Sequence, residues 1–273
     1  MTLGITLVPL PTHRVALPTG ELAFHDVSPP EPAATVVFVP GYTGSKEDFA
    51  LLAAPVAEAG FRYVSLDQRG QFESVGPDDP AAYTVDALGA ELVAFLAALG
   101  DGPHHVVAHS FGGLVARAAA IAAPEAFRSL VLMDSGPAGL SGPRVEGMRA
   151  LEPLLDSHGM EHVFEAVLAG SRVRPHDELV AFLRRRWLAS SVTGLRVMGN
   201  EVQTEPDRVE ALRATGVPVY VMAGEHDDAW PPELQREMAE RLGAPFALIP
   251  GAVHSPAAEQ PAETMRVLLG WLS

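Results

Sequence analysis

Short apolar runs alternate with longer amphipathic stretches along most of the chain. Most of these runs are apolar at every position and rich in β-branched residues, which is typical of strands covered by helices on both faces of a sheet. The predicted strands are Thr35–Val39, Arg62–Leu66, His105–His109, Ser129–Met133, Val217–Met222 and Phe246–Ile249. Alternation of this kind predicts βαβ units and an α/β fold with a mostly parallel, doubly wound sheet.

The stretches between these runs have helical spacing of apolar residues. The predicted helices are Lys46–Ala59, Thr84–Leu99, Gly112–Ala123, Pro232–Leu242 and Pro261–Leu272. Upstream of them, Gly4–Val8 and Glu21–His25 are expected to form antiparallel edge strands, with a turn at Pro18, Thr19 and Gly20 between them.

One interval breaks the alternation. From residue 137 to residue 214 the chain shows amphipathic helical pattern interrupted by glycine and proline, with no convincing strand pattern. We expect this interval to form an inserted helical cap over one end of the sheet. The predicted organisation is therefore a core in two parts, 1–136 and 215–273, separated by a helical cap at 137–214.

Composition narrows the possible functions. The 273 residues include 34 acidic and 19 basic side chains, for a formal net charge of −15, which argues against nucleic acid and anionic membrane surfaces as partners. Cysteine is absent, which excludes disulfides and thiolate chemistry. No apolar run approaches the roughly 18 residues of a membrane span, and Met1 to Pro11 lack a basic segment typical of signal peptides. We expect a cytoplasmic protein without a membrane span; its oligomeric state stays open.

The most informative segment joins a predicted strand to a predicted helix at a serine. The strand pattern ends at His109, Ser110 follows, and helical pattern begins at Gly112. Such a sharp turn exposes the serine hydroxyl and requires small neighbours, which Ala108 and Gly112 supply. It also places the serine at a helix N-terminus, where negative charge is favoured. Ser110 is therefore a candidate nucleophile; the alternative is a serine that only caps the helix.

Two further strand ends carry the groups that a serine nucleophile needs. A serine hydroxyl is a weak nucleophile without a base and a group that orients the base. Asp227 follows the predicted strand Val217–Met222, and His254 follows Phe246–Ile249. Because the C-terminal ends of parallel strands face one crevice, Ser110, Asp227 and His254 are expected at the same edge of the sheet.

These segments resemble the α/β-hydrolase family with a helical cap, in particular its serine esterases, and the resemblance covers nearly the whole chain. The matching segments, which also carry Ser, Asp and His in the family's order, are Val39-Pro40-Gly41-Tyr42, Asp67-Gln68-Arg69-Gly70, Ala108-His109-Ser110-Phe111-Gly112-Gly113, Gly224-Glu225-His226-Asp227 and Gly251-Ala252-Val253-His254-Ser255-Pro256. The resemblance implies an α/β-hydrolase fold with Ser110 on a nucleophile elbow. It also implies an oxyanion hole between the backbone N–H groups of Tyr42 and Phe111, where Gly41 allows the close turn.

The acid of the expected catalytic triad has alternatives. Asp227 fits the Gly-x-x-Asp spacing of the acid turn, and Asp228 is its neighbour. Asp134 ends the predicted strand Ser129–Met133, a position that carries the acid in some relatives. We predict Ser110, Asp227 and His254 as the catalytic residues and keep Asp134 and Asp228 as alternative acids.

The chain departs from the family pattern at three places. Ala108 replaces the usual first glycine of the nucleophile motif, and Pro40 stands where relatives often have histidine. A third departure, Gln71-Phe72-Glu73-Ser74, replaces the common His-Gly-x-Ser. We interpret these departures as bearing on the substrate, because none of them removes a member of the triad.

Apolar side chains are the expected lining of a substrate pocket. Besides Gly41, the candidates are the aromatic residues Tyr42, Phe111, Trp187 and Trp230, and a pocket of this kind suits a small or medium apolar acyl substrate.

Two polar clusters in the expected cap are interpreted as surface. The run Arg184–Arg186 is expected on the solvated face of a helix whose apolar side includes Leu179, Phe182 and Leu183. Asp156, His158 and His162 have helical spacing for a metal, but no third strong ligand lies nearby, so a polar face is the preferred interpretation. We expect neither a metal site nor a cofactor.

The sequence thus predicts a cofactor-free serine hydrolase that cleaves a carboxylic ester or a related acyl compound through an acyl-enzyme intermediate. The same triad could act on a lactone, a thioester or a carbon–carbon bond, or in perhydrolysis, because fold does not determine the reaction. A function of another class is a non-catalytic receptor for a small ligand on the same fold.

Overall fold

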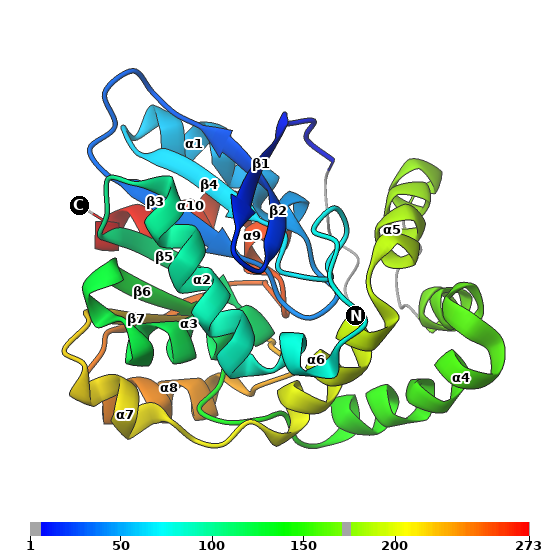
Figure 1. Ribbon diagram of the computed structural model, residues 1–273. Helices are drawn as coiled ribbons and strands as arrows, with labels where there is room; N and C mark the ends of the chain where they lie inside the picture. The colour runs from blue at the N-terminus through cyan, green and yellow to red at the C-terminus, as the bar shows by residue number, and fades with distance from the viewer. Residues whose placement is uncertain (1–6, 171–175, 273) are drawn as a thin grey trace.

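The computed structural model describes residues 7–170 and 176–272, which form a sheet covered by helices on both faces (Figure 1). The sheet has eight strands in the order β1-β2-β4-β3-β5-β6-β7-β8. Their bounds are β1 Thr12–Leu17, β2 Gly20–Val27, β3 Thr35–Val39, β4 Arg62–Leu66, β5 His104–His109, β6 Phe127–Met133, β7 Val219–Gly224 and β8 Phe246–Ile249. The β1–β2 and β2–β4 pairs are antiparallel and all the others are parallel. The predicted mostly parallel α/β sheet is therefore confirmed.

Each face of the sheet buries its own layer of apolar side chains. In β3, Val37 and Val39 pack towards one face, whereas Val36 and Phe38 pack towards the other, as the period of two in a strand requires. The first face is covered by α2 (Val85–Leu99), α3 (Phe111–Ala122) and α8 (Pro232–Leu242), and the second by η1 (Lys46–Leu52), α1 (Ala53–Glu58) and α10 (Pro261–Leu272). Because both faces are covered, the parallel strands are mostly apolar, with β3 buried at every position. The short helices η2 (Pro80–Tyr83), η3 (Pro124–Ala126) and α9 (Pro256–Glu259) complete the core.

Two elements near the N-terminus differ from the sequence prediction. Part of the strand expected over Gly4–Val8 lies outside the described residues, Leu7 and Val8 belong to no strand, and the edge strand is β1. The helix expected over Lys46–Ala59 is a 3₁₀ helix, η1, followed by α1. Pro55 lies in the first turn of α1, where its missing N–H removes no hydrogen bond within that helix, so an α-helix can begin at Ala53.

A helical cap is inserted between β6 and β7 (Figure 1). It contains α4 (Pro143–Ala169), α5 (Asp177–Ala189) and α6 (Val192–Thr204), and α4 is kinked at Gly159, whose φ is 77°. The last helix of the insertion, α7 (Val209–Ala214), packs against α3 and α8 and buries Val209 and Leu212 in the apolar core of the first sheet face. The insertion thus begins as a cap and ends as part of the sheet-covering layer.

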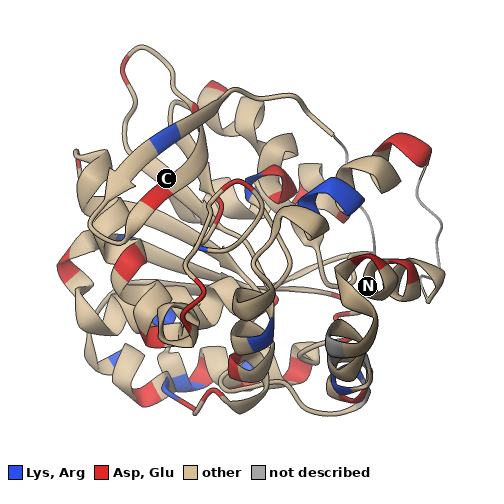
Figure 2. Cartoon of the chain, turned by 45° about the vertical axis from the view of Figure 1, so that its right-hand side comes forward, with Lys and Arg blue, Asp and Glu red and all other residues tan. Residues whose placement is uncertain are grey.

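Charge is distributed over both parts of the molecule. Figure 2 shows acidic residues on helices of the core and of the cap, with basic residues interspersed among them. Among the helices of the described ranges, none combines the length and the apolar character needed to cross a bilayer.

Candidate active site

Ser110 lies at the turn between β5 and α3 in a backbone conformation that non-glycine residues rarely adopt. Its φ and ψ are 53° and −123°, and its N–H donates to the carbonyl of Met133 on the neighbouring strand, at 2.9 Å. A Cβ at position 112 would collide with the carbonyl oxygens of Val39 and Pro40, so only glycine allows α3 to approach β3 this closely. The turn therefore presents the serine side chain at the C-terminal edge of the sheet.

His254 and Asp227 complete a chain of hydrogen bonds with this serine. His254 Nε2 is 3.0 Å from Ser110 Oγ, and His254 Nδ1 is 2.8 Å from Asp227 Oδ1. The buried Asp227 carboxylate also accepts hydrogen bonds from the Ala229 N–H at 2.9 Å and the Gln235 side-chain amide at 2.7 Å. Burial alone would raise the pKa of Asp227, but its hydrogen bond and charge interaction with His254 lower the pKa below its ordinary value. The structure thus brings together the three residues predicted from three separate strand ends.

The two alternative acids lie in different surroundings. Asp134, at the end of β6, is fully buried, and its Oδ1 accepts a hydrogen bond from the Gly224 N–H at 2.7 Å. Burial, followed by the adjacent Asp227 charge, raises the pKa of Asp134 well above its ordinary value, which favours the protonated form of this carboxyl group. Asp228 is turned away towards Arg144, with 2.9 Å between Arg144 Nη1 and Asp228 Oδ1.

Asp134, Asp227 and His254 form a cluster of potential metal ligands in the described part of the chain. One atom each of Asp134, Asp227 and His254 lie within 4.8 Å of one another. The hydrogen bond between His254 and Asp227, and the side-chain hydrogen bond between Asp134 and Asp227, account for this closeness. His158 and His162 on α4 stack on each other with ring centroids 4.6 Å apart, whereas the side chain of Asp156 lies outside the described part of the structure.

His109 contacts His254 and its backbone. Its Nε2 lies 2.6 Å from the carbonyl oxygen of His254, and the two rings are 4.9 Å apart between centroids. Burial, followed by the His254 charge, lowers the pKa of His109 to about 3, so the neutral ring donates Nε2–H to that carbonyl. His109 therefore fixes the backbone of the His254 loop. The only sequence signal for this contact is the position of His109 next to Ser110.

The loop that follows β3 is held by side chains from the loop that follows β4. The Gln68 side-chain amide donates to the Pro40 carbonyl, and the Gln71 side-chain amide donates to the Gly41 carbonyl, each at 2.8 Å. Gln71 Oε1 in turn accepts from the Gln68 N–H at 3.1 Å, which fixes the orientation of its amide group. The Gly41 carbonyl shares its planar peptide unit with the N–H of Tyr42, the expected oxyanion donor. The Gln71 amide, together with the Gly44 N–H that donates to the same carbonyl at 3.0 Å, therefore holds the direction of that N–H.

Lys46 anchors the far end of the same loop. It is the only lysine of the chain and is fully buried. Its backbone N–H donates to Asp67 Oδ1 at 2.7 Å, and its ammonium group lies 3.0 Å from Asp67 Oδ2 and 2.9 Å from Glu47 Oε1. Burial opposes the charge on Lys46, but the neighbouring carboxylates outweigh it and raise its pKa above the ordinary value. The loop from Pro40 to Lys46 is thus attached at both ends to the segment that follows β4.

These contacts change the interpretation of the departures from the family pattern. Gln71 and Ser74 are buried, and the Ser74 hydroxyl donates to the Asp67 carbonyl and accepts from the Ala23 N–H. Neither residue, nor Pro40, is among the residues that line the main pocket. Their positions associate them with support of the loop rather than with contact to a substrate.

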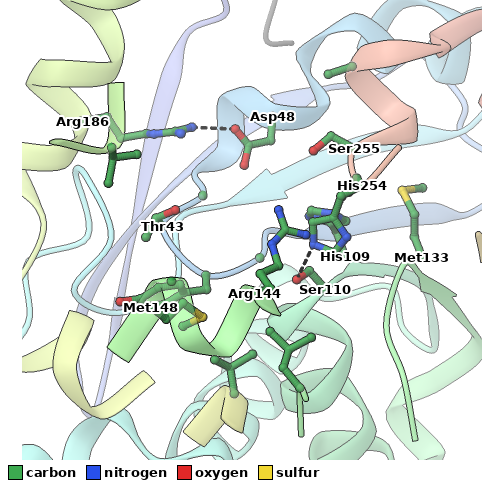
Figure 3. Close-up of a pocket in the computed structure, with 18 of the residues that line it drawn as sticks. Thr43, Asp48, His109, Ser110, Met133, Arg144, Met148, Arg186, His254 and Ser255 are labelled. Atoms are coloured by element: carbon green, nitrogen blue, oxygen red, sulfur yellow. Dashed lines mark hydrogen bonds and ion pairs between the residues drawn. The ribbon is translucent and has the colours of Figure 1, made fainter. Parts of the chain in front are cut away.

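A pocket of about 440 Å³ opens at the serine between the sheet edge and the cap (Figure 3). Its lining includes Gly41 and Tyr42 from the loop after β3, Ser110, His254, and apolar side chains, which are Phe49, Met133, Leu140, Met148, Val167 and Val202. The aromatic residues expected there are distributed differently. Trp230 is 1% exposed, packs in the core and donates its indole N–H to the Ala138 carbonyl at 2.9 Å. Trp187 lines a smaller adjacent cavity, and the Phe111 side chain is fully buried in the core.

The arginine run of α5 is only partly on the surface. Arg184 is exposed and pairs with Glu161 of α4, as expected for a solvated face. Arg186 is buried, lines the pocket and lies 2.6 Å from Asp48 Oδ1 of η1, so its predicted placement on the solvated face is wrong. Arg186 follows Phe182 by one helical turn and therefore shares the inward face of α5. The Asp48 carboxylate compensates the charge of Arg186 there.

Comparison with known proteins decides the family. The sequence pattern of a family described as "Alpha/beta hydrolase family" matches residues 36–267. The chain belongs to the α/β-hydrolase family.

Several relatives of this α/β-hydrolase are known enzymes or are named as such. It is 27% identical over 261 residues to a protein of Mycobacterium tuberculosis named "Putative non-heme bromoperoxidase BpoC", covering 88% of this chain and 93% of the relative. It is 32% identical over 214 residues to N-formylmaleamate deformylase of Pseudomonas putida, covering 75% of each chain. A carboxylesterase structure from the thaumarchaeon Nitrososphaera gargenis superposes with a TM-score of 0.80 at 21% identity, covering 95% of this chain and 97% of the other. The protein is thus a hydrolase-family enzyme with esterase-like structural neighbours.

Proposed function

We propose that this α/β-hydrolase is a cofactor-free serine hydrolase that cleaves a carboxylic ester or a closely related acyl compound. The observation that carries the proposal is the continuous chain of hydrogen bonds from Ser110 Oγ through His254 to Asp227, at 3.0 Å and 2.8 Å. This arrangement supplies a nucleophile, a base and an acid that orients the base, in contact with a pocket.

In the acylation step, Ser110 Oγ attacks the acyl carbon while His254 Nε2 takes the hydroxyl proton. The tetrahedral oxyanion accepts hydrogen bonds from the backbone N–H groups of Tyr42 and Phe111. His254 then donates the proton to the leaving alkoxide, the carbon–oxygen bond breaks, and an ester of Ser110 remains. Asp227 holds the imidazole with Nδ1 protonated and stabilises the imidazolium that forms.

In the deacylation step, water takes the place of the leaving alcohol. His254 removes a proton from this water as its oxygen attacks the acyl carbon, and the same N–H groups stabilise the second oxyanion. Collapse of the intermediate returns the proton to Ser110 Oγ and releases the carboxylic acid.

Other outcomes of the same chemistry are alternatives. Relatives of this chain are named as a bromoperoxidase and as a deformylase that acts on an N-formyl compound, so perhydrolysis, and likewise lactone, thioester or carbon–carbon bond hydrolysis, are candidates for the same triad. A non-catalytic ligand receptor is the alternative from another class, and an intact triad is evidence against it.

A series of 4-nitrophenyl esters tests the proposal. The modest and mostly apolar pocket favours short and medium acyl groups, so we expect the butyrate ester of the series to be cleaved faster than its long-chain esters, and faster than a long-chain triglyceride assayed beside them. We expect His254→Ala to reduce kcat by at least about 10³-fold. Tight binding of small esters without formation of product would contradict the proposal and favour the receptor.

A further inference from the structure

The pocket beside Ser110 contains two arginines whose charges are compensated differently. Arg186 is paired with Asp48, whose other carboxylate oxygen accepts from the Ser45 N–H, and this pair is largely buried. Arg144 lies in the first turn of α4 and lines the same pocket. Among the described residues, Arg144 pairs with Asp228, with 2.9 Å between Arg144 Nη1 and Asp228 Oδ1.

The ion pair between Arg144 and Asp228 is one that Arg144 can exchange for a pair with another carboxylate. The Asp228 side chain is 57% exposed, whereas that of Arg144 is only 18% exposed. An ion pair with an exposed carboxylate contributes little, because water solvates that carboxylate well when it is released. A guanidinium has five N–H donors in a planar fork, and one of them serves Asp228. Arg144 can therefore bind a second carboxylate, or exchange Asp228 for it.

Arg144 is also directed at the reaction centre. Figure 3 shows its side chain extending from α4 towards the rings of His109 and His254. Its positive charge is felt at His109, where it contributes to the lowered pKa of that ring. The first turn of a helix is the positive end of the helix dipole, where a cation is disfavoured and an anion is stabilised. The position thus places two sources of positive potential at the cap side of an otherwise mostly apolar pocket.

We propose that the substrate is an acyl compound with an apolar body and a distal carboxylate, and that Arg144 binds this carboxylate. The inference rests on the proposed serine hydrolase function, and it narrows the substrate class to esters or lactones of dicarboxylic acids. The net charge of −15 disfavours non-specific binding of an anion, so a cation at this position is the means of recognising one.

The kinetic test compares two substrates of equal chain length. One is the mono-4-nitrophenyl ester of glutaric acid, and the other is its methyl ester, in which the distal carboxylate is neutralised. We expect the wild type to favour the acid in kcat/KM, and Arg144→Met to lose about 10-fold or more on the acid but less than about 2-fold on the methyl ester. Arg149→Met changes an exposed arginine of the same helix that hydrogen-bonds Gln203, and it should affect neither substrate. Equal losses on both substrates in Arg144→Met would overturn the assignment.

A binding measurement separates this inference from the proposed reaction. Titration calorimetry with glutarate on Ser110→Ala should show binding that is weakened about 10-fold or more by adding Arg144→Met. Removal of the competing carboxylate by Asp228→Asn should strengthen glutarate binding. If glutarate binds through Arg144 but neither ester is cleaved by the wild type, the hydrolase proposal fails and the carboxylate site stands. If both esters are cleaved and Arg144→Met leaves the affinity for glutarate unchanged, the hydrolase proposal is supported and the carboxylate site is contradicted.

Discussion

The side-chain amide of Gln71 donates a hydrogen bond to the carbonyl of Gly41 at 2.8 Å. That carbonyl and the N–H of Tyr42 belong to one planar peptide unit, so a donor on one side orients and polarises the N–H on the other. The contact links the loop after β4 to the expected oxyanion hole.

Replacement of this amide by an apolar group of similar size should therefore reduce catalysis without weakening substrate binding. We expect Gln71→Leu to lower kcat about 10-fold with little change in KM, since removing an oxyanion donor itself costs about 10²–10³-fold. The rate of inactivation by a fluorophosphonate should fall by a similar factor, because that reaction develops the same oxyanion. A rise in KM at unchanged kcat would indicate a role in binding instead.

Replacement by asparagine should affect kcat strongly at Asp227 and only slightly at the neighbouring Asp134. Asp227→Asn is expected to lower kcat by about 10³–10⁴-fold, because the imidazole loses its orienting acceptor. Asp134→Asn should keep kcat within a few-fold of the wild type, since the raised pKa of Asp134 favours its neutral form and the amide retains an acceptor for the Gly224 N–H. Steady-state kinetics on one ester decide between them. Near-normal turnover in Asp227→Asn together with loss in Asp134→Asn would assign the acid to Asp134.

The buried Asp134 also predicts a pH dependence of stability. In the unfolded chain its proton is released above about pH 3.8, whereas the folded protein retains it to a much higher pH. The unfolded state then binds fewer protons, so this group lowers the free energy of unfolding as the pH rises from about 4 towards neutrality. Asn at this position removes the effect.

We therefore expect Asp134→Asn to become more stable relative to wild type as the pH rises, by up to about 1.4 kcal/mol per pH unit. Urea unfolding at a series of pH values between 4 and 8 measures the difference. A wild type that gains stability over Asp134→Asn across this range would show that Asp134 is ionised in the folded protein.

Lys46 is predicted to be important for stability. Lys46→Met keeps the shape of the side chain but leaves Asp67, which is fully buried, without its cation. Removing one partner of a buried pair costs about 3–5 kcal/mol in the free energy of unfolding. Arg266→Met, which removes a cation from the exposed pair with Glu263, is the matched control and should change little. Similar urea midpoints for the two variants would contradict this account.

Local sequence pattern predicts the parallel part of the fold because a strand that is buried on both faces is a nearly continuous run of apolar residues. β3, β4 and β8 begin and end as predicted. The pattern fails at β1, which is exposed at most positions. Its first three residues are polar and its last three are apolar, so it shows neither strict alternation nor a continuous apolar run. The chain before it is richer in apolar residues, but the two described residues of the predicted strand, Leu7 and Val8, belong to no strand.

The site is predictable only as far as it depends on strand ends. Ser110, Asp227 and His254 each follow a strand, and parallel topology is enough to expect them at one edge. Gln71 lies in the loop after β4, and its role depends on the neighbouring loop that carries Gly41. Burial of Arg186 depends on Asp48, which is 138 residues away in the chain. Such contacts arise from tertiary packing, which local pattern does not encode.

The central claim is that Ser110 is an activated nucleophile, and intact-mass analysis after labelling with a fluorophosphonate tests it most directly. The account predicts one adduct on the folded wild type and none on Ser110→Ala, whose fold is checked by circular dichroism. Absence of an adduct on the folded wild type, or an adduct that persists in Ser110→Ala, would contradict it.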